Sequence, residues 1–262
     1  MNIGFFDSGL GGLLILKAVA KTLPQYDYVY YGDTANVPFG DKTEEEIFSF
    51  TKQAIVELFK RDCLLVIVAC NTSSAETLRR IQDTYLKEEY PDRRILGVIV
   101  PTVEEVIEEG HRRAILLSTK RTAESGKYER ELAKLDETLE LITVATPELV
   151  PLIESGEISR ALQVAIQAIE SQVRAGDVVL LGCTHYVLLK DELRAHFGAD
   201  VTIVSQDEVI PKKLTNYLSR HPEITARLSS TGKREIYLTE HRPDYDRLTA
   251  DFLGGAYISE ME

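Results

Sequence analysis

Two segments of the sequence place a cysteine between an apolar run and a group of polar side chains. They span 65–72, with the sequence LVIVACNT, and 178–185, with the sequence VVLLGCTH. Each pattern predicts a buried strand that ends near the cysteine and a helix that follows it. A thiol at such a place is favoured as thiolate by the helix dipole and the unpaired N–H groups of the first turn. Cys70 and Cys183 are therefore candidates for acid–base or nucleophilic chemistry.

A pair of thiols suits the exchange of a proton on carbon. Removing the weakly acidic α-proton of an amino acid and returning one to the opposite face needs two groups, one starting as thiolate and the other as thiol. His185 follows Cys183 by two residues and could be its proton partner, and Asp7 could relay protons for the other thiol. Three further side chains could donate hydrogen bonds to a carboxylate: Asn71, Thr72 and Thr184.

Other uses of these residues stay open at this point. Cys70, Cys183 and His185 could bind zinc, although the sequence has no C-x-x-C, no H-x-x-x-H and no evident fourth ligand. A single cysteine nucleophile with His185 as its base would leave the second cysteine segment unexplained. The similarity of the two segments could also be chance, in which case both cysteines would be ordinary buried side chains, as we expect for Cys63.

A third polar segment, 6–12 with the sequence FDSGLGG, follows the first predicted strand. Its glycines allow a tight turn and a close approach to a ligand, and its N–H groups could hold an anion. The spacing is neither that of a dinucleotide-binding loop nor that of a P-loop. Ligands of open α/β sheets bind beyond the carboxyl ends of the strands, so Asp7 and Ser8 are candidate ligand contacts.

Short apolar runs alternate with amphipathic segments along the whole chain. We expect strands at 3–6, 28–31, 64–69, 95–99, 114–117, 139–144, 178–181, 201–204 and 235–238. We expect helices at 44–60, 75–86, 103–109, 123–134, 158–173 and 211–219. Thr43 with Glu46, and Thr102 with Glu105, have the spacing of a capping box. The alternation predicts parallel sheets with helices on both faces, and the number of strands favours two α/β domains over one small sheet.

The composition excludes some classes of protein. The net charge is −12, which argues against a nucleic-acid-binding protein because such binding depends on clustered Lys and Arg. No apolar stretch is long enough to cross a membrane, and the first residues lack the pattern of a signal peptide. The three cysteines do not suggest a disulfide framework. We therefore expect a cytoplasmic protein with no membrane or nucleic-acid partner.

Five motifs, in this order and spacing, resemble those of the bacterial glutamate racemases, a branch of the aspartate/glutamate racemase family. The resemblance extends over nearly the whole chain. The motifs are FDSGLGG at 6–12, YGDTA at 31–35 with VPFG at 37–40, ACNT at 69–72, VPLIE at 150–154 and GCTHY at 182–186. The first of them indicates the glutamate enzymes rather than their aspartate or hydantoin relatives.

The resemblance implies a role for each matching residue. Cys70 and Cys183 would be the two acid–base thiols, assisted by Asp7 and His185 respectively, with Glu154 orienting His185. The substrate pocket would be lined by Asp7, Ser8, Phe39, Gly40, Asn71, Thr72, Thr184 and His185. Phe39 stands where tyrosine is common and Val187 where proline is frequent, which affects the expected shape of the pocket but no proposed catalytic group.

The resemblance also implies an architecture and a biological setting. It predicts two doubly wound α/β domains related by a pseudo-twofold axis, with the active site in the cleft between them. The first domain would comprise residues 1–96 and 208–262, and the second would comprise 97–207. The family uses neither pyridoxal phosphate nor metal, commonly forms homodimers, and supplies D-glutamate for peptidoglycan. A racemase of aspartate or another acidic amino acid, and a catalytically silent amino-acid-binding protein, are the alternatives.

Overall fold

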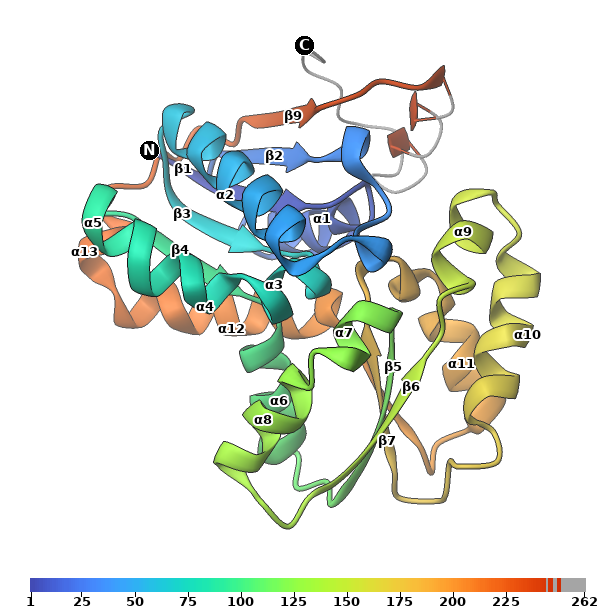
Figure 1. Cartoon of the computed structure of the whole chain (residues 1–262). Helices are drawn as coiled ribbons and strands as arrows, with labels where there is room; N and C mark the ends of the chain where they lie inside the picture. Colours follow the sequence, from blue (N-terminus) through green and yellow to red (C-terminus); the bar gives the residue numbers. More distant parts are fainter. Residues whose placement is uncertain (244, 247–248, 251–262) are drawn as a thin grey trace.

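Two parallel sheets organise the chain in the computed structural model (Figure 1). The structure describes residues 1–243, 245–246 and 249–250, and within them nine strands form one sheet of five and one of four. Each pair of neighbouring strands in these sheets is parallel. The predicted α/β class with parallel sheets is confirmed.

The first lobe is built on the sheet with the strand order β4-β3-β1-β2-β9. Its strands are β1 (Asn2–Asp7), β2 (Tyr28–Gly32), β3 (Cys63–Val68), β4 (Arg94–Gly97) and β9 (Arg234–Leu238). Its helices and short turns are α1 (Gly12–Thr22), η1 (Thr34–Asn36), η2 (Phe39–Asp41), α2 (Glu44–Lys60), α3 (Asn71–Glu76), α4 (Leu78–Ile81), η3 (Gln82–Leu86), α5 (Lys87–Glu89), α12 (Gln206–Arg220) and α13 (Pro222–Thr225). Helices α1 and α12 pack on one face of the sheet, and α2 packs on the other.

The second lobe is built on the sheet with the strand order β6-β5-β7-β8. Its strands are β5 (Arg113–Ser118), β6 (Glu140–Ala145), β7 (Val178–Gly182) and β8 (Thr202–Val204). Its helices and one turn are α6 (Ile99–Glu108), α7 (Lys120–Glu124), α8 (Lys127–Leu135), α9 (Leu149–Glu154), α10 (Ile158–Ile169), η4 (Thr184–Leu189) and α11 (Lys190–Phe197). Helices α6 and α8 cover one face, and α9, α10 and α11 cover the other.

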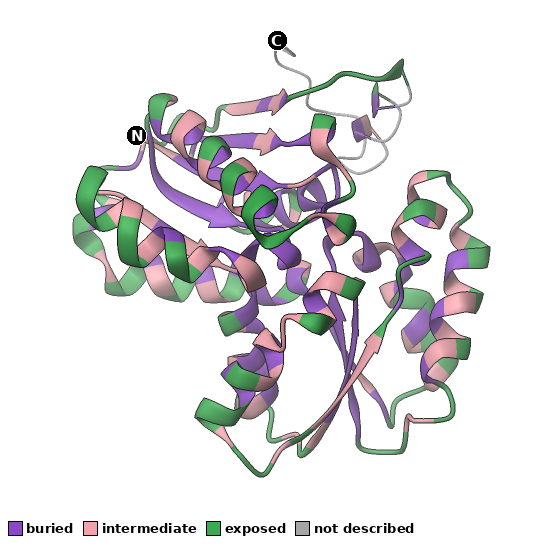
Figure 2. Ribbon diagram, in the orientation of Figure 1, coloured by how far each residue is buried: buried purple, intermediate pink, exposed green. Residues whose placement is uncertain are grey.

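The central strands are buried on both faces, as the purple ribbon in Figure 2 shows. Successive side chains of a strand point to opposite faces, so Phe5 joins the core beneath α1 while Phe6 joins the core beneath α2. In the second sheet, Leu116 and Leu117 divide in the same way. This is why these strands are continuous apolar runs and do not alternate between apolar and polar residues.

Several predicted elements differ from the structure at their ends. The expected strand at 95–99 ends at Gly97, because Ile99 begins α6. The expected helix at 75–86 begins earlier, at Asn71, and is divided into α3, α4 and a π-helical turn. The expected helix at 123–134 is interrupted at Gly126, whose φ of 58° is left-handed and ends the preceding turn.

The two predicted capping boxes have different outcomes. At the start of α2, the Thr43 side chain accepts from the Glu46 amide and the Glu46 carboxylate accepts from the Thr43 amide, so the first box is confirmed. The box of Thr102 with Glu105 is wrong, since α6 already begins at Ile99. Thr102 lies inside that helix, and its hydroxyl donates to the Val98 carbonyl at 2.7 Å.

The chain passes from the first sheet to the second between β4 and β5, and returns between β8 and β9. Helix α12 lies on this return path and contacts both cores, since Val209 packs with the second lobe and Ile210 with the first. The strands thus divide between the sheets as the predicted domain boundaries place them, although those boundaries themselves stay a prediction. Residues 244, 247–248 and 251–262 of the predicted first domain lie outside the described residues.

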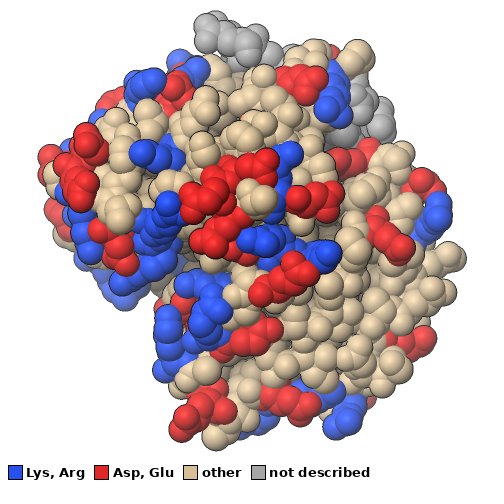
Figure 3. All heavy atoms as spheres, viewed as in Figure 1, with Lys and Arg blue, Asp and Glu red and all other residues tan. Residues whose placement is uncertain are grey.

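Charged side chains of both signs lie next to one another over the face shown in Figure 3. In the part of the chain that the structure describes, no helix is both long enough and apolar enough to cross a membrane.

Candidate functional site

Cys70 is the second residue after β3 and the N-cap residue of α3. Its thiol donates to Ser8 Oγ, and its sulfur accepts from the Ser73 amide, both at 3.4 Å. Only 5% of the residue is exposed. Burial and the nearby negative charge of Asp7 raise the pKa of Cys70 to about 11, although the contacts with Ser73 and Ser8 act in the opposite direction. Cys70 is therefore a neutral thiol at pH 7 in this environment.

Asp7 ends β1 and is fully buried. Its Oδ2 accepts hydrogen bonds from the amides of Gly9 at 3.2 Å and Gly12 at 3.1 Å, and Oδ1 accepts from Thr184 Oγ1 at 3.5 Å. Burial raises the pKa of Asp7 above its usual value, although the charge of His185 and the two amides lower it in part. Asp7 therefore connects the glycine-rich segment of the first lobe to the second cysteine segment.

Cys183 follows β7 and precedes the 3-10 turn η4. His185 Nδ1 lies 3.9 Å from Cys183 Sγ, and His185 Nε2 lies 3.0 Å from Glu154 Oε1 at the end of α9. Burial alone would lower the pKa of His185, but its contacts with Cys183 and Glu154 outweigh this and raise the pKa well above 6.5. Burial raises the pKa of Glu154 and its bond to His185 lowers it, with a net lowering. The charged pair Glu154–His185 therefore lies directly beside Cys183.

The glycine-rich segment fits closely against the second cysteine segment. A Cβ atom on Gly11 would lie 2.7 Å from His185 Nδ1 and would also collide with the Thr184 hydroxyl. A Cβ atom on Gly12 would lie 2.6 Å from the Cβ of Asp7. Gly11 therefore has no room for a side chain because the two lobes meet there, and Gly12 has none because it lies against Asp7 within the first lobe.

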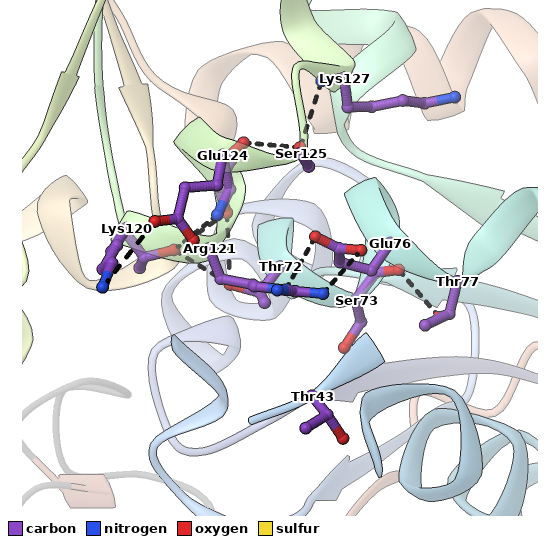
Figure 4. A network of polar contacts seen from close by, with 12 residues as sticks. Thr43, Thr72, Ser73, Glu76, Thr77, Lys120, Arg121, Glu124, Ser125 and Lys127 are labelled. Carbon is purple, nitrogen blue, oxygen red and sulfur yellow. Dashed lines mark hydrogen bonds and ion pairs between the residues drawn. The ribbon is translucent and has the colours of Figure 1, made fainter. Parts of the chain in front are cut away.

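Thr72 lies where the two lobes meet on the other side of the Cys70 turn. Its hydroxyl is 3.1 Å from the hydroxyl of Thr119 and 3.3 Å from that of Thr122, both of which belong to the second lobe. One turn further along α3, Glu76 binds Arg121 of α7, with Oε1 3.0 Å from Nε. Figure 4 shows Thr72 and Glu76 of α3 beside α7, with Glu76 bound to Arg121. The polar contacts of α3 thus fix the second lobe next to Cys70.

The remaining predicted pocket residues lie close by, in different surroundings. Phe39 is buried in the first lobe, with ring centroids 6.4 Å from Phe6 and 6.0 Å from Phe50. A Cβ atom on Gly40 would lie 3.9 Å from the Cβ of Thr119, so the 37–40 segment approaches α7. The Asn71 side chain is engaged by protein groups, Gln206 and Tyr128. The described structure thus gathers the predicted residues around the two cysteine segments, with Phe39 serving as core.

Sequence reasoning missed several polar neighbours of these segments. Thr119 is the first residue after β5, and Gln206 is the second after β8. Both follow the carboxyl end of a strand, which is the rule that selected the cysteine segments and would have selected them too. Tyr128 and Ser73 lie inside helices, where no local pattern distinguishes them.

A cavity of about 550 Å³ opens elsewhere, between α4, α6, α8 and α12. Its walls are largely apolar, with charged side chains such as Arg79, Lys134 and Lys213 among them. None of its lining residues belongs to the predicted site. In the described ranges 1–243, 245–246 and 249–250, no group of three or more His, Cys, Asp or Glu side chains is arranged to hold a metal ion.

The chain is similar in sequence and structure to known proteins. The family model for Asp/Glu/hydantoin racemases matches residues 14–208. A glutamate racemase of Roseobacter denitrificans is 36% identical over 257 residues, which cover 93% of each chain. One of Phenylobacterium zucineum is 34% identical over 278 residues, covering 97% of this chain and 98% of that one.

Solved structures give the same relationship. The glutamate racemase of Francisella tularensis in complex with D-glutamate superposes with a TM-score of 0.87 at 25% identity, covering 100% of this chain and 96% of that one. A glutamate racemase isoform of Bacillus anthracis has a TM-score of 0.86 at 29% identity, again covering 100% of this chain and 96% of the other.

Proposed function

The chain belongs to the Asp/Glu/hydantoin racemase family, and we propose that it interconverts L- and D-glutamate with Cys70 and Cys183 as its two acid–base groups. The substrate is supported by relatives that are glutamate racemases and by a structural neighbour that binds D-glutamate. The observation that carries the mechanism is that each lobe offers one cysteine at the end of a central strand. Asp7 connects their surroundings through its contact with Thr184.

The reaction requires one thiolate and one thiol on opposite sides of the substrate α-carbon. The thiolate removes the α-proton, the electron pair is delocalised into the α-carboxylate, and the opposite thiol then donates its proton to the other face. The first sulfur ends as a thiol and the second as a thiolate, so the reverse reaction uses the same groups in exchanged roles. No redox change and no co-reactant are involved.

The two thiols have different means of bearing charge. The positive charge of His185, held by Glu154, stabilises negative charge on Cys183 Sγ. At Cys70 the Ser73 amide donates directly to the sulfur, while Asp7 opposes its ionisation. We infer that the resting enzyme holds Cys70 as the thiol.

Neutral donors would hold the two carboxylates of glutamate despite the acidic composition of the chain. Hydroxyl groups are the common feature of this part of the structure: Ser8, Thr72, Thr119, Thr122 and Thr184. Hydrogen bonds to a charged acceptor are stronger than those between neutral groups. The hydroxyls therefore supply binding without an additional fixed positive charge, which would favour the thiolate form of both nearby cysteines.

The test is a racemisation assay by circular dichroism on enantiopure glutamate, aspartate and other amino acids. We expect conversion of both glutamate enantiomers, with one deuterium entering Cα in deuterated water. Cys70→Ala and Cys183→Ala should each abolish conversion, since each removes one proton-transfer group. Racemisation without solvent deuterium, or an active single-alanine variant, would refute the two-thiol mechanism. Selective turnover of aspartate would assign a different substrate to the same site.

Three further properties belong to the same proposal. The division into a first domain of residues 1–96 with 208–262 and a second of 97–207, related by a pseudo-twofold axis, is supported by the assignment of strands to the two sheets. A cytoplasmic homodimer that needs neither pyridoxal phosphate nor metal is expected from the family, as is a supply of D-glutamate to peptidoglycan. Size-exclusion chromatography with light scattering tests the dimer.

A further inference from the structure

A buried cluster of three polar side chains joins the residue after Cys70 to the second lobe. Asn71 begins α3 in the first lobe, Tyr128 lies on α8 in the second, and Gln206 begins α12 on the path between them. Their exposed fractions are 3%, 0% and 1%. Polar groups buried to this extent are stable only when their hydrogen bonds are made, so the cluster fixes a specific geometry.

The hydrogen bonds form a closed ring. Asn71 Nδ2 donates to Gln206 Oε1 at 2.8 Å, and Gln206 Nε2 donates back to Asn71 Oδ1 at 2.7 Å. The Tyr128 hydroxyl donates to Asn71 Oδ1 at 2.8 Å and accepts from Gln206 Nε2 at 3.3 Å. Both lone pairs of Asn71 Oδ1 and one Nδ2 hydrogen are used, so the amide cannot turn over without breaking three hydrogen bonds.

The position of the Cys70 sulfur depends on the backbone that this ring holds. Asn71 follows Cys70 directly, and the Cys70 side chain caps the same first turn of α3. The two contacts of the sulfur itself, with Ser8 and Ser73, are weak, because a thiol is a weak donor and a weak acceptor. They restrain the sulfur less firmly than the short amide bonds restrain Asn71, so displacement of Asn71 would displace the thiol.

The ring also fixes the position of the Cys70 turn relative to the second lobe, which carries Cys183. An apolar contact would let α3 slide against α8 and α12 with little change in energy, whereas directional hydrogen bonds allow one arrangement. The Asn71 amide pair spans 135 residues of sequence, and the Tyr128 contact spans 57. The cluster therefore sets the relative position of the two lobes at the point where Cys70 stands.

We propose that Gln206 and Tyr128 are positioning residues that hold the Cys70 turn at the distance from the second lobe that proton transfer requires. The inference rests on the proposed function, because it takes Cys70 as one of the acid–base groups. Neither side chain takes part in the chemistry; each acts through Asn71.

The variants Gln206→Met and Tyr128→Phe test this. The first keeps the length of the side chain and removes its amide, and the second removes only a hydroxyl. Tyr28→Phe is the matched control, since Tyr28 is equally buried and donates one hydrogen bond, to the Leu23 carbonyl at 2.8 Å, at the amino end of β2 away from both thiols. The measurements are kcat and KM for glutamate, the melting temperature, and the alkylation rates of Cys70 and Cys183 by iodoacetamide, resolved by peptide mass spectrometry.

We expect kcat to fall about tenfold or more in both variants while KM changes by less than about threefold. We also expect the ratio of Cys70 to Cys183 alkylation to shift by about threefold or more, with the control unchanged in both respects. Activity and alkylation ratio equal to those of the control would overturn the proposal, and so would a rise in KM with unchanged kcat, which would assign the cluster to substrate binding. If Gln206→Met does not fold, Tyr128→Phe decides. Because the alkylation ratio needs no turnover, it tests the positioning role even if glutamate proves not to be the substrate.

Discussion

Replacement of Gly11 by alanine tests whether the contact between the two lobes at the active site exists in the working enzyme. The backbone of Gly11 has φ −58° and ψ −33°, which alanine adopts without strain, so only the space for the new methyl group matters. That group would lie 2.7 Å from His185 Nδ1 and 2.9 Å from His185 Cε1. Ordinary contact needs about 3.5 Å, so the imidazole or the glycine segment must move by roughly 0.8 Å, and the Thr184 hydroxyl, which the methyl group also meets, must be relieved as well.

The shift would separate His185 from Cys183 or from Glu154, whose contacts are 3.9 Å and 3.0 Å long. A displacement of about 1 Å lowers a catalytic rate about 100-fold, and overpacking lowers the free energy of unfolding by about 1–3 kcal/mol. We therefore expect kcat to fall roughly 30- to 100-fold, measured by circular dichroism of glutamate, with a melting temperature several degrees lower.

Gly4→Ala provides the control, since its methyl group would lie 3.1 Å from Cys63 Sγ and 3.2 Å from Leu58, inside the first lobe. It should lower the melting temperature while leaving kcat within about twofold of the wild-type value. A Gly11→Ala enzyme as active as this control would show that the glycine segment and His185 are not in contact during turnover, and the site described above would be wrong in that respect.

Glu154→Gln should lower kcat/KM by roughly tenfold or more, because the imidazolium beside Cys183 loses the carboxylate that holds its proton. The alkaline limb of the pH–rate profile should move to lower pH for the same reason. An unchanged alkaline limb would contradict the role of Glu154. The difference in the free energy of unfolding between wild type and this variant should be largest between pH 4.5 and 6.5, where the lowered pKa of Glu154 and the raised pKa of His185 both favour the folded pair. This difference should decline as pH rises through the pKa of His185 in the folded protein. Asp7→Asn removes the negative charge that raises the pKa of Cys70, so iodoacetamide should alkylate Cys70 at lower pH than in the wild type, and alkylation at the same or higher pH would exclude that influence. Chelators and carbonyl reagents should leave the rate of racemisation unchanged. If either reagent inhibits the enzyme, and added metal or pyridoxal phosphate restores activity, the reaction is not cofactor-independent.

The sequence predicted most about the reactive side chains that lie at the carboxyl ends of strands. Cys70, Cys183 and Asp7 each follow or end an apolar run, and ligands bind beyond such strand ends, here those of the first sheet for Asp7 and Cys70 and of the second for Cys183. A single rule about strand ends therefore located most of the site. The same rule applied to Thr119 and Gln206 would have extended it, but these residue types alone do not suggest proton transfer.

Contacts between segments that are far apart in the sequence could not be predicted in this way. The role of Glu154 came from resemblance alone, and its bond to His185 joins α9 to the turn after β7. The ring around Asn71 depends on two side chains far away in sequence, so its hydrogen bonds to the protein could not be predicted, while the substrate contact of Asn71 stays a prediction. The capping box predicted at Thr102 failed for a local reason. Thr102 and Glu105 have the required spacing, but they lie inside α6, which begins earlier, at Ile99. Pro101 lies in the first turn of this helix, where a missing N–H is tolerated.

The pairing of β9 with β2 has a consequence for synthesis of the protein. The two strands are neighbours in the first sheet, yet the whole second sheet lies between them in the sequence. On the ribosome the edge of β2, with the sequence YVYYG, stays open until residues 234–238 have emerged. The second lobe, whose strands are contiguous in the chain, is complete before that. An aromatic strand edge exposed for so long invites pairing with other nascent chains. The yield of folded protein therefore depends on how quickly the last strand reaches the first sheet.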